Sequence, residues 1–533
     1  MKILVSDKLS GAGLEILQAD KRVEVDIIPW TSEEALREII GRYHGLLIRS
    51  NTKVTAKVIK CADNLRVIGR AGIGVDNVDV KAATEKGVVV MNTPGGNTVT
   101  TAEHTVSLIM ALSRNIPQAD TAMTNGRWDK KKFMGVELDE KILGLIGLGR
   151  IGQEIARRAQ ALRMKVIAFD PALSAEEMKA LGVRKADETD GVFREADFVS
   201  VHTPLTPQTK NLICKETIAR MKDGVRIINC AQGGIVDESD LAGAVESGKV
   251  AGAALDVFEQ EPPSPDNRLL KLDRVICTPH LGASTREAQE NVSIAIAHQA
   301  LDFLTTGTIV NAVNTPSCTR EAAEALAGYL YLARIVGSMS AQLIGGKPQK
   351  ATLSLISEPF TAHSDAIKNA FLAGLAGGFR KDAKVNEVNA PGLCKDEGIE
   401  ITLESGGSHS EFTNLLRAAV TGKRGECEIS GTVFDERRPR IVSLNGFRME
   451  ISPSEYVLFT ANRDRPGVIG EIGSFLGEHN INIAGMQFGR RQVGGKAVAL
   501  FNVDSPVSPE YLEKLETLPN IDSALLLQLE PFG

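Results

Sequence analysis

Residues 141–162, "KILGLIGLGRIGQEIARRAQAL", decide the fold of this chain. An apolar, strand-like run comes first, then Gly147, Gly149 and Gly152 at G-x-G-x-x-G spacing, and then a helical pattern. Eighteen residues after Gly152, the strand-like run "KVIAF" ends at Asp170, whose carboxylate is placed to accept hydrogen bonds from ribose hydroxyls. The segment therefore predicts a strand–turn–helix unit that binds a dinucleotide. Because a carboxylate repels a 2′-phosphate, Asp170 favours NAD over NADP.

The helix that follows the glycines has its own part in this prediction. A helix N-terminus presents free backbone N–H groups, which suit a pyrophosphate. Taken alone, the glycine spacing also fits an ordinary glycine-rich turn, and it is the strand before it and Asp170 after it that argue for nucleotide binding.

Short apolar runs alternate with helical patterns on both sides of this segment. The runs "KILVSD", "GLLIRS", "LRVIGRAGIG" and "GVVVMNTPGG" precede it, and "DFVSVHTP", "VRIINCA", "AGAALDVF" and "RVICTPH" follow it. This alternation predicts an α/β chain with parallel sheets, and such sheets bind ligands at the carboxyl ends of their strands. The last 80 residues instead give the order strand, helix, strand, strand, helix, which predicts a small ferredoxin-like unit.

Length and composition set limits on the class of protein. A chain of 533 residues predicts two to four domains, and a net charge of −6 argues against a general nucleic-acid binder. The seven cysteines are scattered with no CxxC pair, which predicts neither a disulfide framework nor a metal site. No apolar run reaches membrane-spanning length and the first residues contain no signal-like segment, so we expect a soluble, cytoplasmic protein without a membrane partner.

The segment "TPHLGAST" places His280 between a strand end and an expected helix start. Glu261 lies nineteen residues earlier in "FEQEPP". A hydride-transferring enzyme needs a group that exchanges a proton with the substrate oxygen, and an imidazole supported by a carboxylate can do this. A lone histidine is more often a surface or core residue, and Glu261 also fits a solvated loop, so spacing alone leaves both interpretations open.

Residues 1 to 312 resemble the D-isomer-specific 2-hydroxyacid dehydrogenases, through "IRSNTKVTAKVI", "GRAGIGVDNVD", "MNTPGGNT", "KKFMGVEL" and "HLGASTREAQ". The remaining residues are similar to the tail of that family's long form. The resemblance implies a Rossmann-type doubly wound nucleotide domain, a flavodoxin-like substrate domain, an α+β intervening domain and a ferredoxin-like ACT regulatory domain. The implied boundaries are 1–97 with 295–312 for the substrate domain, 98–294 for the NAD-binding domain, 313–452 for the intervening domain and 453–533 for the ACT domain.

The resemblance also assigns roles to individual residues. It makes His280 the acid/base and Glu261 its partner. The implied NAD-binding residues are Gly147, Gly149, Arg150, Ile151, Gly152, Asp170, His202, Thr203, Pro204, Cys230, Ala231, Asp256, Gly282 and Ala283. The implied substrate-binding residues are Arg49, Ser50, Arg70, Ala71, Gly72, Ile73, Asn97 and Lys130. Within that set, the backbone of 70–73 suits a carboxylate, and Arg49, Arg70 and Lys130 suit a phosphate dianion.

The segment "NCAQGGIVDE", residues 229–238, departs from the family, in which the position of Gln232 is an arginine that binds the carboxylate and keto oxygen of the substrate. Glutamine keeps one donor group but loses the charge, and removing one such electrostatic donor typically costs about 10²- to 10³-fold in rate. Three explanations stay open: a working enzyme with a rerouted carboxylate contact, a low-activity variant, or a non-catalytic protein that senses NAD(H).

The implied reaction is NAD-dependent oxidation of 3-phospho-D-glycerate to 3-phosphohydroxypyruvate, the first step of phosphorylated L-serine biosynthesis. The alternatives are another 2-hydroxyacid dehydrogenase, acting on glycerate or 2-hydroxyglutarate, and the NAD(H) sensor. The resemblance further implies a homo-oligomer, a dimer or tetramer. It also implies L-serine as an effector, bound by Asn462, Asp464 and Asn482 of the ACT segment, although Asp-Arg-Pro-Gly in that segment also fits a plain turn.

Overall fold

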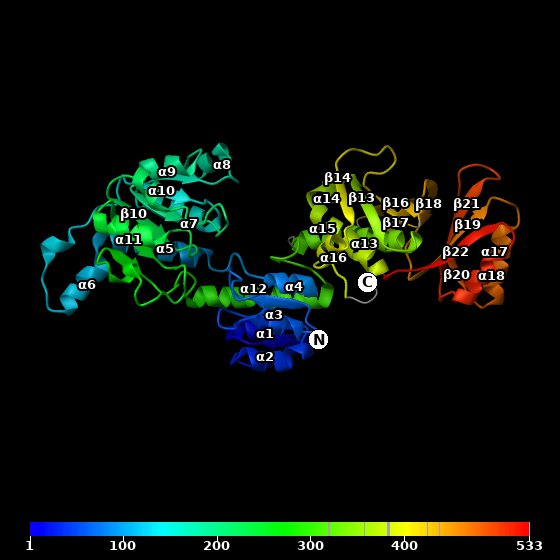
Figure 1. The fold of residues 1–533 in the computed structure, drawn as a ribbon, viewed down its shortest axis with the longest axis horizontal. Helices are drawn as coiled ribbons and strands as arrows, with labels where there is room; N and C mark the ends of the chain where they lie inside the picture. The colour runs from blue at the N-terminus through cyan, green and yellow to red at the C-terminus, as the bar shows by residue number, and fades with distance from the viewer. Residues whose placement is uncertain (318–319, 357, 381–383, 424, 436, 532–533) are drawn as a thin grey trace.

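Four β-sheets, joined in chain order, organise the structure (Figure 1). The computed structural model describes residues 1–533 apart from 318–319, 357, 381–383, 424, 436 and 532–533. In Figure 1 the first and second sheets form two lobes joined by α12, and the third and fourth sheets lie on the other side of the first sheet.

The first sheet is entirely parallel, with strand order β2-β1-β3-β4-β5. Its strands are β1 (Lys2–Val5), β2 (Glu24–Ile27), β3 (Gly45–Ile48), β4 (Val67–Arg70) and β5 (Val89–Met91). The helices between them are α1 (Gly11–Ala19), α2 (Glu33–Ile39), η1 (Ile40–Arg42), α3 (Ala56–Lys60) and α4 (Val80–Lys86). The order is that of a flavodoxin-like domain, as expected.

Local signals fix where these helices begin and end. Ser10 accepts a hydrogen bond from Gly13 N at the start of α1, and Asp79 accepts one from Ala82 N at the start of α4. At the end of α4, Gly87 adopts φ 77°, the left-handed conformation that stops a helix. Each helix therefore returns the chain to the next parallel strand.

The second sheet is also entirely parallel, with order β12-β11-β10-β9-β6-β7-β8. Its strands are β6 (Ile142–Ile146), β7 (Lys165–Phe169), β8 (Arg184–Lys185), β9 (Phe198–Val201), β10 (Val225–Asn229), β11 (Val250–Leu255) and β12 (Val275–Cys277). The helices are α5 (Thr98–Arg114), α6 (Ile116–Thr124), η2 (Lys130–Phe133), α7 (Arg150–Ala161), α8 (Ala175–Ala180), α9 (Thr189–Glu195), α10 (Lys215–Arg220), α11 (Glu238–Ser247) and η3 (Arg268–Lys271). The order reverses between β6 and β9, where doubly wound sheets bind nucleotides.

Helix α12 (Arg286–Thr306) leaves the second sheet and returns to the first, where Ser293 packs against Gly13 of α1. A bridge between Met91 and Ala312 then adds the following segment to the edge of the first sheet. The first domain is therefore built from two separate stretches of chain.

The third sheet is mixed, with order β14-β13-β15-β16-β17-β18. Its strands are β13 (Pro348–Ile356), β14 (Glu400–Ser405), β15 (Leu415–Gly422), β16 (Gly425–Phe434), β17 (Arg438–Leu444) and β18 (Phe447–Ile451). Helices α13 (Arg320–Leu343), α14 (Glu358–Ala362), α15 (Ser364–Phe379) and α16 (Ala390–Asp396) accompany it. Helices α13 and α15 pack closely, because Gly337 and Gly374 leave room for the backbone of the facing helix.

The fourth unit has the expected ferredoxin-like order, β19 (Tyr456–Arg463), α17 (Val468–Glu478), β20 (Ile483–Arg490), β21 (Lys496–Val503), α18 (Pro509–Glu516) and β22 (Ile521–Gln528). Its sheet is antiparallel, with order β20-β21-β19-β22. The fold class inferred from the sequence is thus confirmed. The domain boundaries stay predictions.

No described helix is long and apolar enough to cross a membrane. In the same described ranges, His, Cys, Asp and Glu side chains form no group of three or more that could hold a metal ion.

Candidate active site

The glycine-rich turn joins β6 to α7 at the centre of the second sheet. A Cβ on Gly147, which has φ 94°, would overlap the carbonyl of His202, and a Cβ on Gly152 would overlap the carbonyl of Gly147. Gly149 differs from both, because a Cβ there would meet no atom within 4 Å. Two glycines thus serve packing, and Gly149 faces open space at the N-terminus of α7. The open face fits a pyrophosphate that must approach the backbone closely.

Asp170 follows the last residue of β7 and lies beside this turn. Its Oδ2 accepts a hydrogen bond from Leu148 N at 2.7 Å, and its Oδ1 accepts one from Ala172 N at 2.9 Å. These bonds fix the carboxylate next to the glycines, where a ribose would lie against it. Across the turn, Arg150 Nη1 lies 3.1 Å from the position that a Cβ on Gly95 would take, so the guanidinium reaches from α7 to the loop after β5.

His202 follows β9 and lies beside the turn in the adjacent strand end. Its Nε2 is 2.7 Å from Ser200 Oγ, and burial lowers the pKa of His202 to about 3. The ring is therefore neutral at physiological pH, so His202 suits contact with a cofactor rather than proton exchange. Thr203 and Pro204 continue the same strand end, which Thr209 Oγ1 anchors by donating to the carbonyl of Pro204.

Asp256 is 1% exposed and holds the loop that carries His280. Its Oδ1 accepts hydrogen bonds from Thr278 Oγ1 at 2.5 Å and Leu281 N at 2.8 Å, and its Oδ2 accepts one from Gly282 N at 2.8 Å. Its backbone carbonyl accepts from His280 N at 2.9 Å. Asp256 therefore fixes both flanks of His280.

A fourth side-chain contact to Asp256 comes from His104 on α5, with Nε2 3.1 Å from Oδ1. Burial raises the pKa of Asp256, but donation by His104, by Thr278 and by two backbone N–H groups outweighs it, so the pKa lies below its ordinary value. The carboxylate is thus an ionised anchor at neutral pH.

His280 and Glu261 are hydrogen-bonded, with 2.8 Å between Nδ1 and Oε2. The other oxygen of Glu261 accepts from Phe258 N at 3.1 Å, which fixes the carboxylate. The two side chains keep 55% and 38% of their surface exposed. Since Nδ1 is occupied by the carboxylate, Nε2 is the ring nitrogen available to a substrate.

Gln232 lies in the loop after β10, next to the segment that carries Glu261. Its carbonyl accepts from Asn229 Nδ2 at 2.9 Å, and a Cβ on Gly233 would overlap the carbonyl of Phe258. The Gln232 side chain is exposed, and no described residue forms a hydrogen bond with its amide. The neighbouring Cys230 is buried, which raises its pKa to about 12, so its thiol is protonated at neutral pH. Ala231, the next residue, is more exposed than Cys230.

Two arginines lie at the carboxyl ends of β3 and β4. Arg70 Nε donates to Asn77 Oδ1 at 3.0 Å, and its side chain is only 14% exposed. Arg49 contacts Gln289 Oε1 at 3.5 Å, while its buried Nε has no hydrogen-bond partner. Asn77 links them, because its Nδ2 donates to the carbonyl of Arg49 at 2.7 Å. Arg70 also pairs with Asp76 at 4.0 Å, so the unpartnered Nε of Arg49 is the donor that remains for an anion.

The backbone after Arg70 forms the turn expected to bind a carboxylate. Gly72 has φ 156°, and its N–H donates to Thr93 Oγ1 at 2.9 Å. The carbonyl of Ile73 is used by Asn92 Nδ2, and Ala71 N donates to the carbonyl of Ile48. The N–H groups of Ala71 and Gly72 and the carbonyl of Ile73 are thus already hydrogen-bonded within the protein.

The other substrate-side positions are less closely grouped. Ser50 is exposed beside Arg49, and the buried Oδ1 of Asn97, at the start of α5, has no hydrogen-bond partner. Lys130 lies on η2, close in sequence to α6, and its side chain is exposed. Figure 1 shows α6 standing away from both sheets.

Two of the three ACT positions, Asp464 and Asn482, are engaged with other residues of the domain. Asn462 is fully buried with Oδ1 unpartnered, and Asp464 Oδ2 accepts from Gly494 N at 3.0 Å and Arg490 at 2.9 Å. Those two donors hold the pKa of Asp464 below its ordinary value. Asn482 instead donates to Asp504 Oδ2 at 2.7 Å.

Sequence reasoning did not find the supporting residues of this site. Asn77, His104, Thr278 and Asn229 hold the functional positions, and so does Asp7, whose Oδ2 accepts from Arg49 N at 2.6 Å. The only signal in the sequence is that several follow strand ends, where polar residues gather in parallel sheets.

Three family models match the chain in order. Residues 106–282 match the NAD binding domain of D-isomer specific 2-hydroxyacid dehydrogenases, residues 325–445 the intervening domain of D-3-phosphoglycerate dehydrogenase, and residues 456–520 the ACT domain.

Full-length relatives and solved structures agree with these models. The chain is 41% identical to D-3-phosphoglycerate dehydrogenase of Synechocystis over 99% of its length and 95% of that protein. It is also 41% identical to D-3-phosphoglycerate dehydrogenase of Archaeoglobus fulgidus, over 99% and 100% of the two chains. The crystal structure of an NAD-dependent formate dehydrogenase from Staphylococcus aureus in complex with NAD superposes with a TM-score of 0.51 at 26% identity, over 60% of this chain and all of that one.

Proposed function

The chain belongs to the D-3-phosphoglycerate dehydrogenase family, and from this we propose that it oxidises the C2 hydroxyl of 3-phospho-D-glycerate to the ketone of 3-phosphohydroxypyruvate, using NAD. The single observation that carries this proposal is the 2.8 Å hydrogen bond between His280 and Glu261, because it supplies a proton acceptor at the carboxyl edge of the same sheet that carries the glycine turn. In a cell, this reaction would commit phosphoglycerate to L-serine synthesis in the cytoplasm.

The residues around the glycine turn fit NAD. Gly149 leaves open space at the N-terminus of α7, Asp170 lies beside it for the ribose, and neutral His202 lies near the expected nicotinamide side. When bound, NAD supplies the acceptor for the hydride that leaves C2. Arg150 and Ile151 would cover the pyrophosphate, and Gly282 and Ala283 would contact the nicotinamide end.

His280 has the task of taking the hydroxyl proton. Its Nδ1 is held by Glu261, so Nε2 would accept the proton, and the imidazolium that forms would be stabilised by the carboxylate. In the reverse direction the same nitrogen returns the proton to the keto oxygen. Proton transfer by a positioned side chain contributes typically about 10²- to 10⁴-fold to a rate.

The substrate's charged ends would meet the first domain. The guanidiniums of Arg49 and Arg70 would meet the phosphate, and the turn at Gly72 would bind the carboxylate once the Gly72 N–H gave up its bond to Thr93 Oγ1. Gln232 would donate a neutral hydrogen bond where the family has an arginine. We propose that the enzyme works with a weaker electrostatic contact at this position.

Steady-state activity with 3-phospho-D-glycerate and NAD, measured beside D-glycerate and 2-hydroxyglutarate, tests this function. Preference for the phosphorylated substrate supports it. Equal turnover of unphosphorylated D-glycerate would favour the other 2-hydroxyacid dehydrogenases. Tight NADH binding without turnover of any of the three would favour the NAD(H) sensor.

L-Serine is the effector we propose for the ACT domain. Its ammonium would replace Arg490 at Asp464, and the amides of Asn462 and Asn482 would meet its other end. Calorimetric titration of L-serine into the chain and into Asp464→Ala tests this. Equal binding to both, or to neither, contradicts the site.

We also propose a homo-oligomer, a dimer or tetramer, formed through the α6 arm, which we define as residues 116–134 with α6 and η2. Four large apolar side chains near this arm are exposed: Ile116 (54%), Met123 (54%), Trp128 (78%) and Met134 (83%). Exposed apolar surface of this kind marks an interface. Light scattering of the chain and of a Trp128→Asp, Met134→Asp variant should show loss of the oligomer, and an unchanged mass would place the interface elsewhere.

A further inference from the structure

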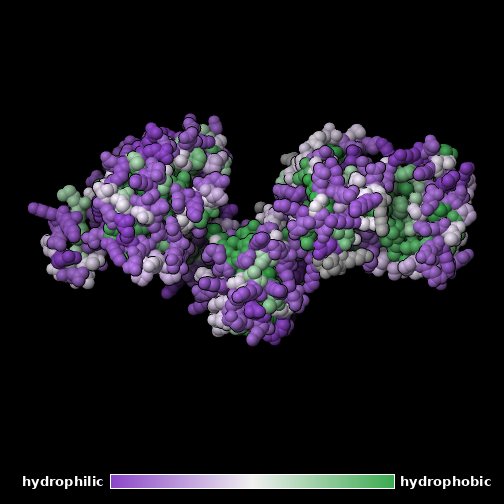
Figure 2. All heavy atoms as spheres, viewed as in Figure 1, coloured by the Kyte–Doolittle hydropathy of each residue, from purple (hydrophilic) through white to green (hydrophobic). Residues whose placement is uncertain are grey.

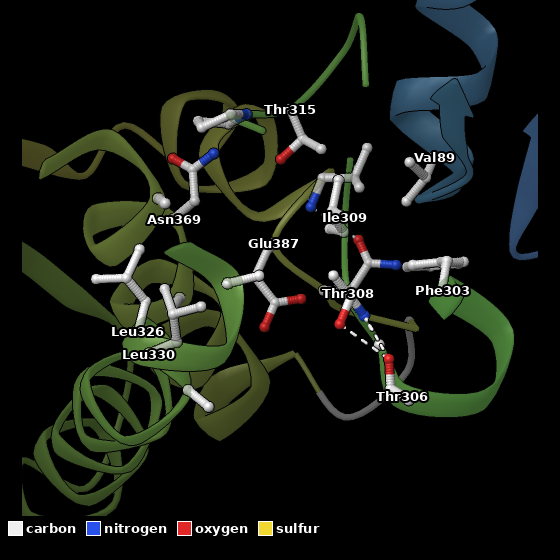
Figure 3. Close-up of a pocket in the computed structure, with 18 of the residues that line it drawn as sticks. Val89, Phe303, Thr306, Thr308, Ile309, Thr315, Leu326, Leu330, Asn369 and Glu387 are labelled. Carbon is white, nitrogen blue, oxygen red and sulfur yellow. Dashed lines mark hydrogen bonds between the residues drawn. The ribbon is translucent and has the colours of Figure 1, made fainter. Parts of the chain in front are cut away.

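A cavity of about 790 Å³ lies between the first sheet and the intervening domain. Phe303 of α12, Val89 of β5 and Ile309 line it from one side, and Leu326 and Leu330 of α13 line it from the other. Figure 3 shows these apolar side chains on opposite walls, with the segment after α12 passing between them. Its volume lies within the range of pockets that hold small ligands.

This cavity is separate from the candidate active site. It is lined by Arg66 and Gly87, which lie at the amino-terminal ends of β4 and β5. Arg70 and Gly72, in contrast, lie at the carboxyl-terminal end of β4. Parallel sheets bind substrates and cofactors at carboxyl ends, so neither NAD nor the hydroxyacid accounts for this cavity.

One buried polar side chain is turned into the cavity without a partner. Asn369 of α15 is 8% exposed, and none of the described residues forms a hydrogen bond with its amide. In Figure 3 this amide and the hydroxyl of Thr315 point toward one another across one end of the cavity. The amide is therefore open to the cavity, and it offers both a donor and an acceptor to a molecule that fills it.

The charges around the cavity favour an anion. Glu387 projects into it and pairs with Arg334 at 2.5 Å. Glu324 also lines the cavity, so three arginines stand against two carboxylates in its lining. Arg66 and Arg437 are exposed and line its rim, and neither forms an ion pair with a carboxylate in the described ranges. Arg66 lies over the Phe303 ring, 5.3 Å from its centroid, which holds the guanidinium at the apolar wall.

We propose that this cavity binds a small anionic amphiphile, a molecule with an apolar chain or ring and one carboxylate. The apolar body would lie between Phe303 and Leu330, and the carboxylate would face Arg66 and Arg437. A polar substituent on the body would satisfy Asn369.

Such a ligand would also regulate the enzyme. It would contact both the first domain and α13, so it stabilises their present arrangement. Arg334, at its edge, also forms an ion pair with Glu530, just after the last ACT strand, at 2.8 Å. Binding of a ligand in this cavity would therefore affect the catalytic domains and the ACT domain together.

Calorimetric titration of the full-length protein with octanoate tests the proposal, with octan-1-ol and octylamine as probes of the same length. Octanoate should bind saturably to one site per chain, and the alcohol and amine about tenfold more weakly or worse. Ala327→Trp fills the cavity from an exposed position on α13 and should abolish binding. Ala325→Trp, exposed on the same helix but outside the lining, is the matched control and should bind normally.

A second variant tests the charge. Arg66→Gln with Arg437→Gln should weaken octanoate about tenfold and leave octan-1-ol unchanged. The proposal is overturned if octanoate does not bind, if Ala327→Trp binds it normally, or if alcohol and carboxylate bind equally well. If Ala327→Trp fails to fold, Leu330→Gln serves in its place and carries the same expected loss.

Discussion

His280 adopts an unusual backbone conformation for a side chain with a catalytic role. Its φ of 54° lies in the left-handed region, which costs a residue other than glycine free energy. Asp256 offsets this cost, because it accepts from the N–H groups of His280, Leu281 and Gly282. The position of the imidazole is thus set by a buried carboxylate that lies outside its own loop.

Replacing His280 should remove proton transfer without removing the cofactor site. For His280→Ala we expect kcat to fall about 10²- to 10⁴-fold, while NADH affinity changes little. Steady-state kinetics and fluorescence titration with NADH measure the two effects. His298→Ala, an exposed histidine on α12, is the control and should match the parent protein. Normal turnover in His280→Ala would remove this residue from the mechanism.

Restoring a charge at residue 232 should improve the enzyme. For Gln232→Arg we expect kcat/KM for the phosphorylated substrate to rise about tenfold or more, since a charge-assisted bond is stronger than a neutral one by about 1–2 kcal/mol and about 1.4 kcal/mol corresponds to tenfold. Gln18→Arg on α1 adds the same charge at an exposed, distant position and should have no effect. If kcat/KM does not rise, another cation already supplies the contact.

Asp256 should contribute a pH dependence to stability. Its pKa is lowered on folding, so its contribution is complete above the unfolded value of about 3.9 and is lost as pH falls through the lower folded value. Asp256→Asn should unfold more easily by about 1–3 kcal/mol at neutral pH and lose less stability on acidification. Urea unfolding at several pH values measures both. Asp266 is 96% exposed, so Asp266→Asn should lose stability on acidification as the parent protein does. If Asp256→Asn also lost stability as the parent does, Asp256 would not be the source of the pH dependence.

The sequence indicated His280, Glu261 and Asp170 because their chemistry suits a dehydrogenase at strand ends. It could not indicate that Asp256 holds the His280 loop. That role depends on β11 and β12 lying side by side and on His104 reaching in from α5, and the second of these contacts joins residues 152 positions apart.

At the scale of elements, the turn between β6 and α7 combines two kinds of glycine. Gly152 is required by the close approach of the Gly147 carbonyl, and Gly149 has φ −67°, which any residue can adopt. The same motif therefore contains one position that serves the fold and one that serves the ligand.

Alanine at these two positions should separate the two roles. Gly152→Ala should lower Tm, because its Cβ collides with backbone, and should weaken NADH binding through that distortion. Gly149→Ala should fold with a normal Tm and still weaken NADH binding, by about tenfold, because only the cofactor meets the new methyl group. Thermal unfolding and NADH titration measure both, and normal NADH affinity in Gly149→Ala would place the pyrophosphate elsewhere.

The order of the strands was predictable only where it follows from parallel βα units. Short apolar runs such as "VRIIN" alternate with helices, and right-handed crossovers leave few arrangements of such units. The third sheet is different. Its strands pair mostly antiparallel, with β14 parallel to β13 at the edge, and nothing local in the sequence specifies that partner.

At the scale of the whole molecule, α13 connects three parts of the chain. Arg334 on this helix forms ion pairs with Glu387 and Glu530, and Gln342 hydrogen-bonds both the N–H and the carbonyl of Gln528 on the edge strand β22. The loop with Glu387 also reaches the first domain, where Asn386 Nδ2 donates to the carbonyl of Gly87 at 2.7 Å. Polar contacts from one helix thus fix the ACT domain and the first domain together.

Removing Arg334 should loosen this arrangement. For Arg334→Met we expect a loss of about 1–2 kcal/mol, because two partly exposed carboxylates lose their partner and solvent screens much of each pair. Denaturant unfolding measures the loss, and limited proteolysis near residue 387 should become faster. Arg438→Met removes an exposed pair of the same type and should change neither. Unaltered stability and proteolysis in Arg334→Met would show that apolar packing alone holds the domains.

The apolar contacts between the third and fourth sheets have a consequence for how the molecule unfolds. Val457, Leu500 and Leu527 of the ACT sheet belong to the same buried cluster as Leu353 and Leu416 of the intervening sheet (green surface at this junction in Figure 2). The two domains therefore share a core and should melt in a single calorimetric transition. A chain truncated at the boundary between them would keep the intervening fold but leave its apolar side uncovered, so we expect it to aggregate rather than to behave as an enzyme freed from regulation.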